Sequence, residues 1–356
     1  MNDKNKAHAL ICQNKPWANI DNNIWIASTV SLSRNIEKFK FPGKLSEDRK
    51  KQIITLIDKD PFKLDGLEKP KLIKADEITP IEKEYLSEHF LTQHGFLQTG
   101  SGDGFILDET GEFLGVLNLV DHLFFLLIDW HGELESAWER LVKIEMEMGK
   151  TFKYSFSTKY GFLTAEPTEC GTAMLASVFL QVPGMIHIGT IDEFLEKNAD
   201  DSISVTGIHG SPTDVIGDVL VIQNNYTLGV TEESILSSLR TITHKILAEE
   251  TAVRLQIKKN GNPEIKDKVS RAYAILSHSY QIEAIEALNA ISLLKLGLEM
   301  EWITGVTMAD LNRLFFNCRR GHLLNQFQEA IPQEEILHRR AEYIHKTFKD
   351  LKLVIL

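Results

Sequence analysis

Hydrophobic and polar residues alternate along several stretches of the chain, and this period of two predicts β-strands. The stretches are residues 23–32, 104–109, 113–120, 152–158, 202–208 and 218–228. In residues 132–150 and 231–252, apolar residues recur every three or four positions, which predicts helices. Thr231 is the predicted N-cap of the second helix. Strands combined with long amphipathic helices favour an α+β fold with a mainly antiparallel sheet.

The pattern changes near residue 258. The segment KKNGNPEIKDK is polar and contains Gly and Pro, so we interpret it as a linker or an exposed turn. Beyond it the chain is helix-patterned, and a strand signal returns only in the terminal LKLVIL. We therefore expect an N-terminal tail over residues 1–20, an α+β domain over 21–257 and a helical C-terminal domain over 258–356.

Composition and charge narrow the class of protein. The chain is 43% hydrophobic and 25% charged, which is typical of a soluble globular protein. Its formal net charge of −11 disfavours a nucleic-acid partner, because phosphate neutralisation needs a basic surface. No stretch approaches the length of a membrane span, and the N-terminus has no signal-like apolar core. We expect a cytoplasmic protein that does not bind a membrane.

General motifs of catalysis and metal binding are missing from the sequence. The cysteines Cys12, Cys170 and Cys318 are few and widely separated, which argues against a disulfide framework and a zinc site. Cys170 has no histidine close in sequence, so a buried structural role is favoured over a nucleophilic one. There is no phosphate-binding loop, HExxH pair or GxSxG elbow. The sequence predicts no metal site.

An ordered series of segments carries a more specific signal. The segments are IWIASTVSLSRNI, EHFLT, VLNLVDHLFF, YGFLTAEPTECGTAMLASVFLQVP and VTGIHGSPTDVIGDVLVIQNNYTLGVTEE. Over roughly residues 20–255 the series resembles the catalytic domain of phosphagen (guanido) kinases. It is most similar to bacterial protein-arginine kinases of the McsB type, especially the divergent chlamydial form. The resemblance implies a glutamine-synthetase-like antiparallel sheet flanked by helices, followed by a helical domain.

The resemblance also indicates where ATP binds in active relatives. The corresponding positions here are Ser28, Thr29, Ser31, His89, Phe124, Leu175 and Thr206. His89 matches the histidine of the family's nucleotide pocket, but the five arginine positions hold Thr, Ser, Phe, Leu and Thr. Arginine forks stabilise the charge on a phosphoryl group during transfer. The resemblance therefore implies a mostly degenerate ATP site, with ATP and Mg²⁺ as cofactors only if the chain is active.

The catalytic positions differ in the same way. Leu119 and Val120 replace two glutamates of an Asn-Glu-Glu-Asp-His-Leu-Arg motif, Glu166 stands at a cysteine position, and Ser211 replaces a loop glutamate. No intact catalytic set is left to orient or deprotonate a guanidinium group.

Other motif residues are kept. Arg34 and Asn35 follow the altered arginine positions, and Asn118 and Asp121 are interpreted as scaffold residues. His122 and His209 are interpreted as hydrogen-bonded structural histidines rather than ligands of nucleotide or metal.

The C-terminal region has a candidate allosteric motif. Active relatives carry Arg-Asp-x-x-Arg-Ala, which recognises phosphoarginine, and this chain keeps only Arg340 and Ala341. Arg319, Arg320 and His322 add positive charge nearby in the sequence. Such a cluster suits a phosphorylated or acidic segment, while ordinary surface arginines are the simpler interpretation.

Three functions stay open. The first is a pseudokinase that acts as an adaptor or regulator in Clp-type protein quality control, with an adaptor or Clp chaperone-protease component as partner. The second is an active ATP-dependent protein-arginine phosphotransferase with a rebuilt site, for which Lys153 and Lys159 are the nearest cations in sequence. The third is a sensor of a nucleotide or small metabolite. The altered arginine positions favour the first, and a homodimer is left open.

Overall fold

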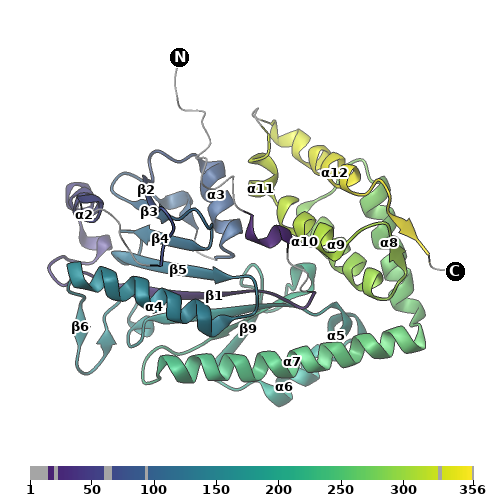
Figure 1. Ribbon diagram of the computed structural model, residues 1–356, viewed down its shortest axis with the longest axis horizontal. Helices are drawn as coiled ribbons and strands as arrows, with labels where there is room; N and C mark the ends of the chain where they lie inside the picture. Colours follow the sequence, from purple (N-terminus) through teal and green to yellow (C-terminus); the bar gives the residue numbers. More distant parts are fainter. Residues whose placement is uncertain (1–14, 20–22, 60–65, 93–94, 328–330, 355–356) are drawn as a thin grey trace. The chain divides into compact units, whose positions relative to one another are not determined.

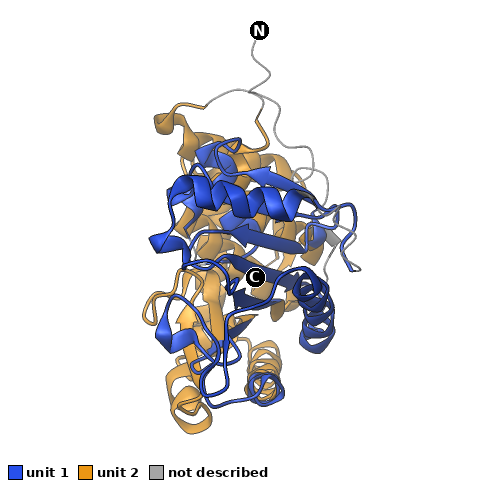
Figure 2. Ribbon diagram, turned by 90° about the vertical axis from the view of Figure 1, so that its left-hand side faces the viewer, with its two compact units in different colours: residues 1–16, 28–177, 223–239 blue, residues 17–27, 178–222, 240–356 orange. Residues whose placement is uncertain are grey.

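A computed structural model describes residues 15–19, 23–59, 66–92, 95–327 and 331–354. The chain forms two compact units, shown in blue and orange in Figure 2. Unit 1 contains residues 1–16, 28–177 and 223–239, and unit 2 contains residues 17–27, 178–222 and 240–356. The domain boundaries inferred from the sequence stay a prediction. Most of the expected tail lies outside the described residues, but Trp17 is fully buried against Phe316 and His322 in unit 2.

The main sheet has eight strands in the order β2-β3-β4-β5-β1-β8-β10-β9 (Figure 1). These are β1 (Trp25–Arg34), β2 (Lys71–Lys74), β3 (Gly104–Leu107), β4 (Phe113–Leu117), β5 (Leu123–Asp129), β8 (Met174–Gln181), β9 (Ile203–Gly207) and β10 (Val219–Asn224). The pairs from β2 through β5 to β1 are antiparallel. A short hairpin, β6 (Phe156–Ser157) and β7 (Gly161–Phe162), stands apart from the sheet. The predicted antiparallel α+β class is confirmed.

Whether a strand was predicted from alternating polar and apolar residues depends on how much of the strand is buried. The predicted segments match β1, β3, β4, β9 and β10, whereas residues 152–158 give only the two residues of β6. Strands β2, β5 and β8 were not predicted. Seven of the eight residues on β8 and five of the seven residues on β5 are buried. A strand covered on both faces is a continuous apolar run without a period of two.

The described residues of unit 1 include three helices of more than two turns that lie wholly within it. They are α2 (Glu47–Lys59), α3 (Pro80–His89) and α4 (Leu134–Thr151), with the 3₁₀ turns η2 (Pro42–Lys44), η3 (Phe96–Gln98) and η4 (Pro167–Glu169). Helix α3 begins with a capping box in which Thr79 and Glu82 satisfy each other's backbone amides. Helix α4 was predicted, and it packs a stripe of buried residues spaced three or four apart against β5.

Helix α7 (Glu232–Asn260) passes through both units. Its predicted cap is confirmed, since the Ser234 amide donates a hydrogen bond to Oγ1 of Thr231 over 3.2 Å. The helix runs beyond the predicted end at residue 252 and stops at Gly261, which has a φ of 63°. Asn262 then caps the next helix, whose first residue is Pro263. The expected linker is therefore only a tight turn, because Gly-Asn-Pro stops one helix and starts another.

Unit 2 contains the helical C-terminal region, as predicted. Its shorter elements are η1 (Pro16–Asn19), α5 (Pro183–Ile188), α6 (Ile191–Asn198), η5 (Ile216–Asp218), α11 (Arg320–Leu324) and η6 (Gln333–Glu335). The longer helices are α8 (Pro263–His278), α9 (Ala284–Glu299), α10 (Met308–Asn317) and α12 (Ile336–Thr347). The strand signal at the C-terminus gives β12 (Lys352–Leu353), which pairs with β11 (Ile303–Thr304). Within the described ranges, every helix is too short or too polar to span a bilayer.

A buried polar network links α7, α9 and β8 inside unit 2. Glu250 accepts hydrogen bonds from the Gly184 and Met185 amides at the start of α5, and from Nε of Arg254 over 2.6 Å. Lys295, on α9, donates to Oε1 of Gln181 over 2.6 Å. Burial, aided by the charge of Arg254, lowers the pKa of Lys295 to about 7.

Candidate functional site

A cavity of about 140 Å³ in unit 1 brings four of the predicted positions together. Leu119, Val120, Phe124 and Glu166 all line it. The remaining lining residues are Ser33, Phe96, Val116, Asp121 and Glu169. Three of the four catalytic positions therefore share one cavity with one ATP position.

The floor of the cavity is part of one face of the main sheet. Ser33 on β1 is paired with Phe124 on β5, and Phe124 is paired in turn with Val116 on β4. Directly paired residues project from the same face of a sheet. The floor therefore combines one hydroxyl with an aromatic and an aliphatic side chain.

The β4–β5 turn forms one wall. Asn118 begins this turn with a φ of 61°, and its Nδ2 donates to the carbonyl oxygens of Gly102 and Lys50 over 2.9 and 3.1 Å. Nδ1 of His122 accepts a hydrogen bond from the Ile36 amide over 3.2 Å. Burial lowers the pKa of His122 to about 4, so the ring is neutral near pH 7. The side chains of Asn118 and His122 thus both make hydrogen bonds to the backbone of neighbouring segments.

Asp121 extends from the same turn into the cavity lining. Its Oδ1 accepts hydrogen bonds from Nδ2 of Asn35 over 2.5 Å and from the Ala165 amide over 2.7 Å. Burial raises the pKa of Asp121 despite these donors, and the charge of Glu166 adds to the effect. The carboxylate thus fastens the turn to both β1 and the loop after β7.

Glu166 and Glu169 form the opposite wall at the two ends of η4. Burial raises the pKa of Glu169, and the charges of Asp121 and Glu166 raise it further. None of the described residues that line the cavity is a lysine or an arginine. Three carboxylates in a small, partly apolar space give it a negative potential that repels phosphate.

The residues present therefore do not fit a triphosphate. A phosphate clamp needs convergent cationic donors, and the lining offers carboxylates and apolar groups instead. In the described part of the chain, no group of three or more His, Cys, Asp or Glu side chains is placed to hold a metal ion.

Two of the predicted ATP positions lie along the same face of β1 as the cavity floor. Thr29 and Ser31 precede Ser33 at intervals of two, and both are buried. Ser31 Oγ donates to the carbonyl oxygen of Leu175 on β8 over 3.1 Å. Ser28 is an odd number of residues from Thr29, Ser31 and Ser33, so its side chain projects from the other face of the sheet. These hydroxyls are packed within the sheet.

Other predicted positions lie elsewhere. Thr206 is on β9, and Ser211 closes a tight turn in which the Gly207 amide donates to the carbonyl oxygen of Ser211 over 2.7 Å. Both belong to unit 2. His89 is buried on α3 in unit 1, where its Nε2 lies 2.6 Å from the carbonyl oxygen of Gly111. His209 is exposed.

The cations considered for a rebuilt site do not line the cavity. Lys153 pairs with Glu37 over 2.9 Å and lines a separate pocket beside Phe39. Lys159 lies over the ring of Tyr160, 4.9 Å from its centroid. Arg34 is buried, where it pairs with Glu145 over 2.8 Å and stacks on a phenylalanine ring.

Three of the four basic residues considered for a C-terminal allosteric site are buried too. Arg340 is 2% exposed, and its Nε and Nη1 donate to the carbonyl oxygens of Cys318 and Ile282, each over 2.8 Å. Ala341, Arg319 and His322 are also buried. These contacts give Arg340 a role in joining α12 to the ends of neighbouring helices.

Sequence reasoning missed part of the lining. Phe96, Val116 and Glu169 were not singled out, and Ser33 was passed over although its spacing from Thr29 and Ser31 places it on their face. Phe96 comes from a 3₁₀ turn outside the motif segments, whereas Glu169 lies within one of them.

Comparison with known families identifies the class of protein to which the chain belongs. Residues 52–253 match the family described as "ATP:guanido phosphotransferase, C-terminal catalytic domain". Residues 262–353 match the "Protein-arginine kinase McsB C-terminal domain". The chain is therefore a member of the ATP:guanido phosphotransferase class.

Full-length relatives narrow the family. A protein-arginine kinase from Chlamydia muridarum is 32% identical over 88% of this chain and 89% of its own length. The protein-arginine kinase from Halothermothrix orenii is 31% identical over 91% of this chain and 93% of its own length. The one from Chlamydia pneumoniae is 29% identical over 93% of this chain and 93% of its own length. The chain belongs to the protein-arginine kinase family.

Solved structures agree on the fold. The duplicated taurocyamine kinase from Schistosoma mansoni with bound transition-state analogue components is 22% identical, with a TM-score of 0.58 over 76% of this chain and 40% of that one. Lombricine kinase is also 22% identical, with a TM-score of 0.55 over 72% of this chain and 74% of its own. These likenesses show a guanidino-kinase fold.

Proposed function

We propose that this protein is a member of the protein-arginine kinase family that binds other proteins without phosphorylating them. The observation that carries the proposal is the lining of the unit 1 cavity, where Asp121, Glu166 and Glu169 stand beside apolar side chains and no cation is among the described lining residues. Phosphoryl transfer asks a protein chiefly for positioning and for positive charge around the transferred group. A negative cavity disfavours both ATP binding and the transition state.

The same lining suits a positively charged side chain. Carboxylates recognise guanidinium through charge-assisted hydrogen bonds, and the partly buried position of Glu169 strengthens such pairing. We infer that the cavity can hold an arginine side chain of a client protein, which gives its three carboxylates a role without a phosphate clamp. An adaptor or a Clp-type chaperone-protease component remains our proposed partner, and a cytoplasmic location our expectation.

The test pairs a phosphotransfer assay with a binding assay. The purified chain is incubated with ATP, Mg²⁺ and arginine-rich casein, with the Halothermothrix orenii relative as a reference, and acid-labile phosphoarginine is measured by mass spectrometry. We expect none from this chain. Phosphoarginine above the level of an ATP-free control would overturn the proposal.

Binding is measured by fluorescence anisotropy with a labelled peptide that contains one arginine. Glu166→Gln combined with Glu169→Gln should weaken binding by about tenfold. Replacing two exposed carboxylates outside the cavity, Glu196→Gln with Glu249→Gln, should leave it unchanged. Equal affinity for the two double variants would show that the cavity does not hold the arginine.

A further inference from the structure

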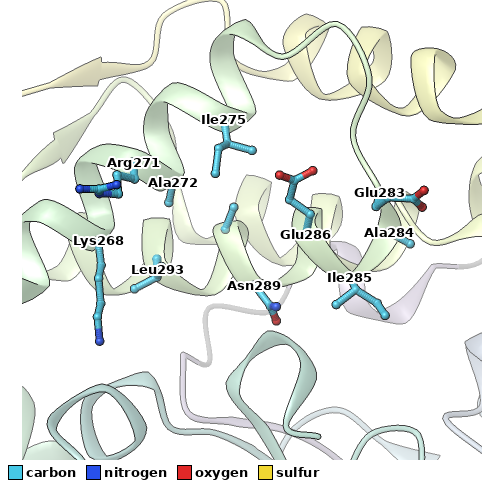
Figure 3. A pocket seen from close by; sticks show the side chains of 11 residues that line it. Lys268, Arg271, Ala272, Ile275, Glu283, Ala284, Ile285, Glu286, Asn289 and Leu293 are labelled. Atoms are coloured by element: carbon cyan, nitrogen blue, oxygen red, sulfur yellow. The ribbon is translucent and has the colours of Figure 1, made fainter.

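A second concave surface lies between α8 and α9, entirely within unit 2 (Figure 3). This groove has a volume of about 790 Å³. Its apolar lining is Ala272, Ile275, Ala284, Ile285, Ala290 and Leu293. Ile285 is 47% exposed. Several of the lining residues are alanines, which let another backbone approach the floor closely.

The two ends of the groove carry opposite charge. Lys268 and Arg271 lie at one end beside Leu293, whereas Glu283 and Glu286 lie at the other beside Ile285 (Figure 3). The segment of α9 from Glu283 to Leu293 is about 15 Å long at a helical rise of about 1.5 Å per residue. That separation exceeds the screening length of about 8 Å at physiological ionic strength. Each end therefore acts as a separate electrostatic site.

Intramolecular contacts leave these charges available. Arg271 pairs with Asp267 over 2.7 Å, but both side chains are exposed, so the pair contributes little. Lys268 Nζ lies 3.4 Å from Nδ1 of His187. Glu283 and Glu286 have no ion-pair partner among the described residues. Carboxylates three residues apart on a helix repel each other, and a cation from outside would relieve this.

We propose that this groove binds one amphipathic helix of a partner protein. The helix has about three turns. Its apolar stripe packs on the alanines and leucine of the floor, a basic residue at one end pairs with Glu283 and Glu286, and an acidic residue at the other end pairs with Lys268. The proposal is independent of the function proposed for the unit 1 cavity.

The shape and the charge spacing favour this occupant. A small ligand that fits one end cannot reach the other, so it would leave one charge pair unused. A second copy of the chain that presented the same groove would place one concavity against another, which leaves space unfilled. A convex helix fills a concave groove between two helices and reaches both ends.

The test uses the full chain and three labelled helical peptides with the same leucine stripe. One has a lysine end and a glutamate end, one has lysine at both ends, and one has glutamate at both ends. By fluorescence anisotropy, we expect the mixed peptide to bind at least about tenfold tighter than either uniform peptide. Glu283→Lys with Glu286→Lys should shift the preference to the peptide with two glutamate ends.

A matched control changes the same net charge elsewhere. Glu196→Lys with Glu249→Lys lies on exposed positions of α6 and α7 and should keep the preference for the mixed peptide. Circular dichroism checks that each variant is folded. Absence of saturable binding, or a preference that Glu283→Lys with Glu286→Lys does not change, would overturn the proposal. Self-association that Ile285→Glu abolishes would overturn it in favour of a second copy as occupant.

Discussion

Asn35 donates a hydrogen bond from Nδ2 to Oδ1 of Asp121 over 2.5 Å, and both side chains are almost completely buried. The bond joins the end of β1 to the β4–β5 turn. Asn35 also accepts from the His122 amide and donates to the carbonyl oxygen of Leu163. Asn35 and Asp121, two motif residues that the sequence singled out, thus connect the end of β1, the β4–β5 turn and the loop after β7.

Four of the predicted site positions have another property in common. Leu119, Val120, Phe124 and Glu166 line the cavity and do not bridge these elements. By contrast, Arg34 is buried in a pair with Glu145. Positions that face a cavity can vary with a smaller loss of stability than positions whose side chains connect buried elements.

Replacing Asn35 should therefore destabilise unit 1. Asn35→Ala removes two buried hydrogen bonds and one partly buried one, and it leaves Asp121 partly unsatisfied, which should lower the free energy of unfolding by about 2–4 kcal/mol. Urea denaturation followed by fluorescence measures the change. Gln98→Ala, at an exposed amide, is the control and should cost less than about 0.5 kcal/mol. Similar midpoints for the two variants would contradict the structural role of Asn35.

Two adjacent arginines on α12 should behave differently. Arg340→Ala removes buried donors to two carbonyl oxygens and should destabilise the chain by about 3 kcal/mol. Arg339→Ala removes only exposed ion pairs with Glu335 and Glu342 and should cost less than about 1 kcal/mol. Thermal unfolding of the two variants gives the comparison. If Arg340 instead serves as a phosphoarginine receptor, free phosphoarginine will raise the midpoint of the wild type.

Lys295 should make stability depend on pH. Its pKa is about 7 in the folded chain against an ordinary value of 10.5, so between these values the unfolded chain binds the additional proton. The free energy of unfolding should then rise with pH, by up to about 1.4 kcal/mol per unit. Below about pH 7 both states are protonated and this contribution to the slope vanishes.

Denaturation at about pH 7.5 and about pH 9.5 measures this slope, and Lys295→Met removes it. Methionine has a similar length and no charge, so the variant should gain stability relative to wild type at the lower pH and lose that advantage at the higher pH. Lys259→Met, at an exposed position of α7, is the control and should leave the slope unchanged. An identical slope in wild type and Lys295→Met would show that Lys295 does not titrate in this range.

Much of the fold could be predicted from periodicity, but only where one face of an element is exposed. Helix α4 presents a regular buried stripe, and Thr231 has the chemistry of a helix cap. Strands β5 and β8 lie in the interior of the sheet, and their apolar runs have no period to detect. The capping box of α3 was present in the sequence at Thr79 and Glu82, and it was overlooked.

The candidate site was predictable to the extent that motifs marked it. The resemblance identified Val120, Phe124 and Glu166 as site positions, and the fold brings them into one cavity. Phe96 lies outside these motifs, and the proximity of Phe96 and Glu169 to Phe124 depends on tertiary packing of two short turns. Arg340 was predicted from its motif, yet its burial became visible only once α12 was placed against α10.

Titration of the chain with ATP and Mg²⁺ in an isothermal calorimeter tests the central claim most directly, because it measures nucleotide binding without requiring a substrate. A cavity lined by Asp121, Glu166 and Glu169 should give no saturable heat up to about 1 mM ATP, the concentration at which the binding free energy is about −4 kcal/mol. The Halothermothrix orenii relative is titrated in parallel as a reference. Saturable binding of ATP to this chain with a Kd below about 100 μM, competed by ADP, would contradict the account.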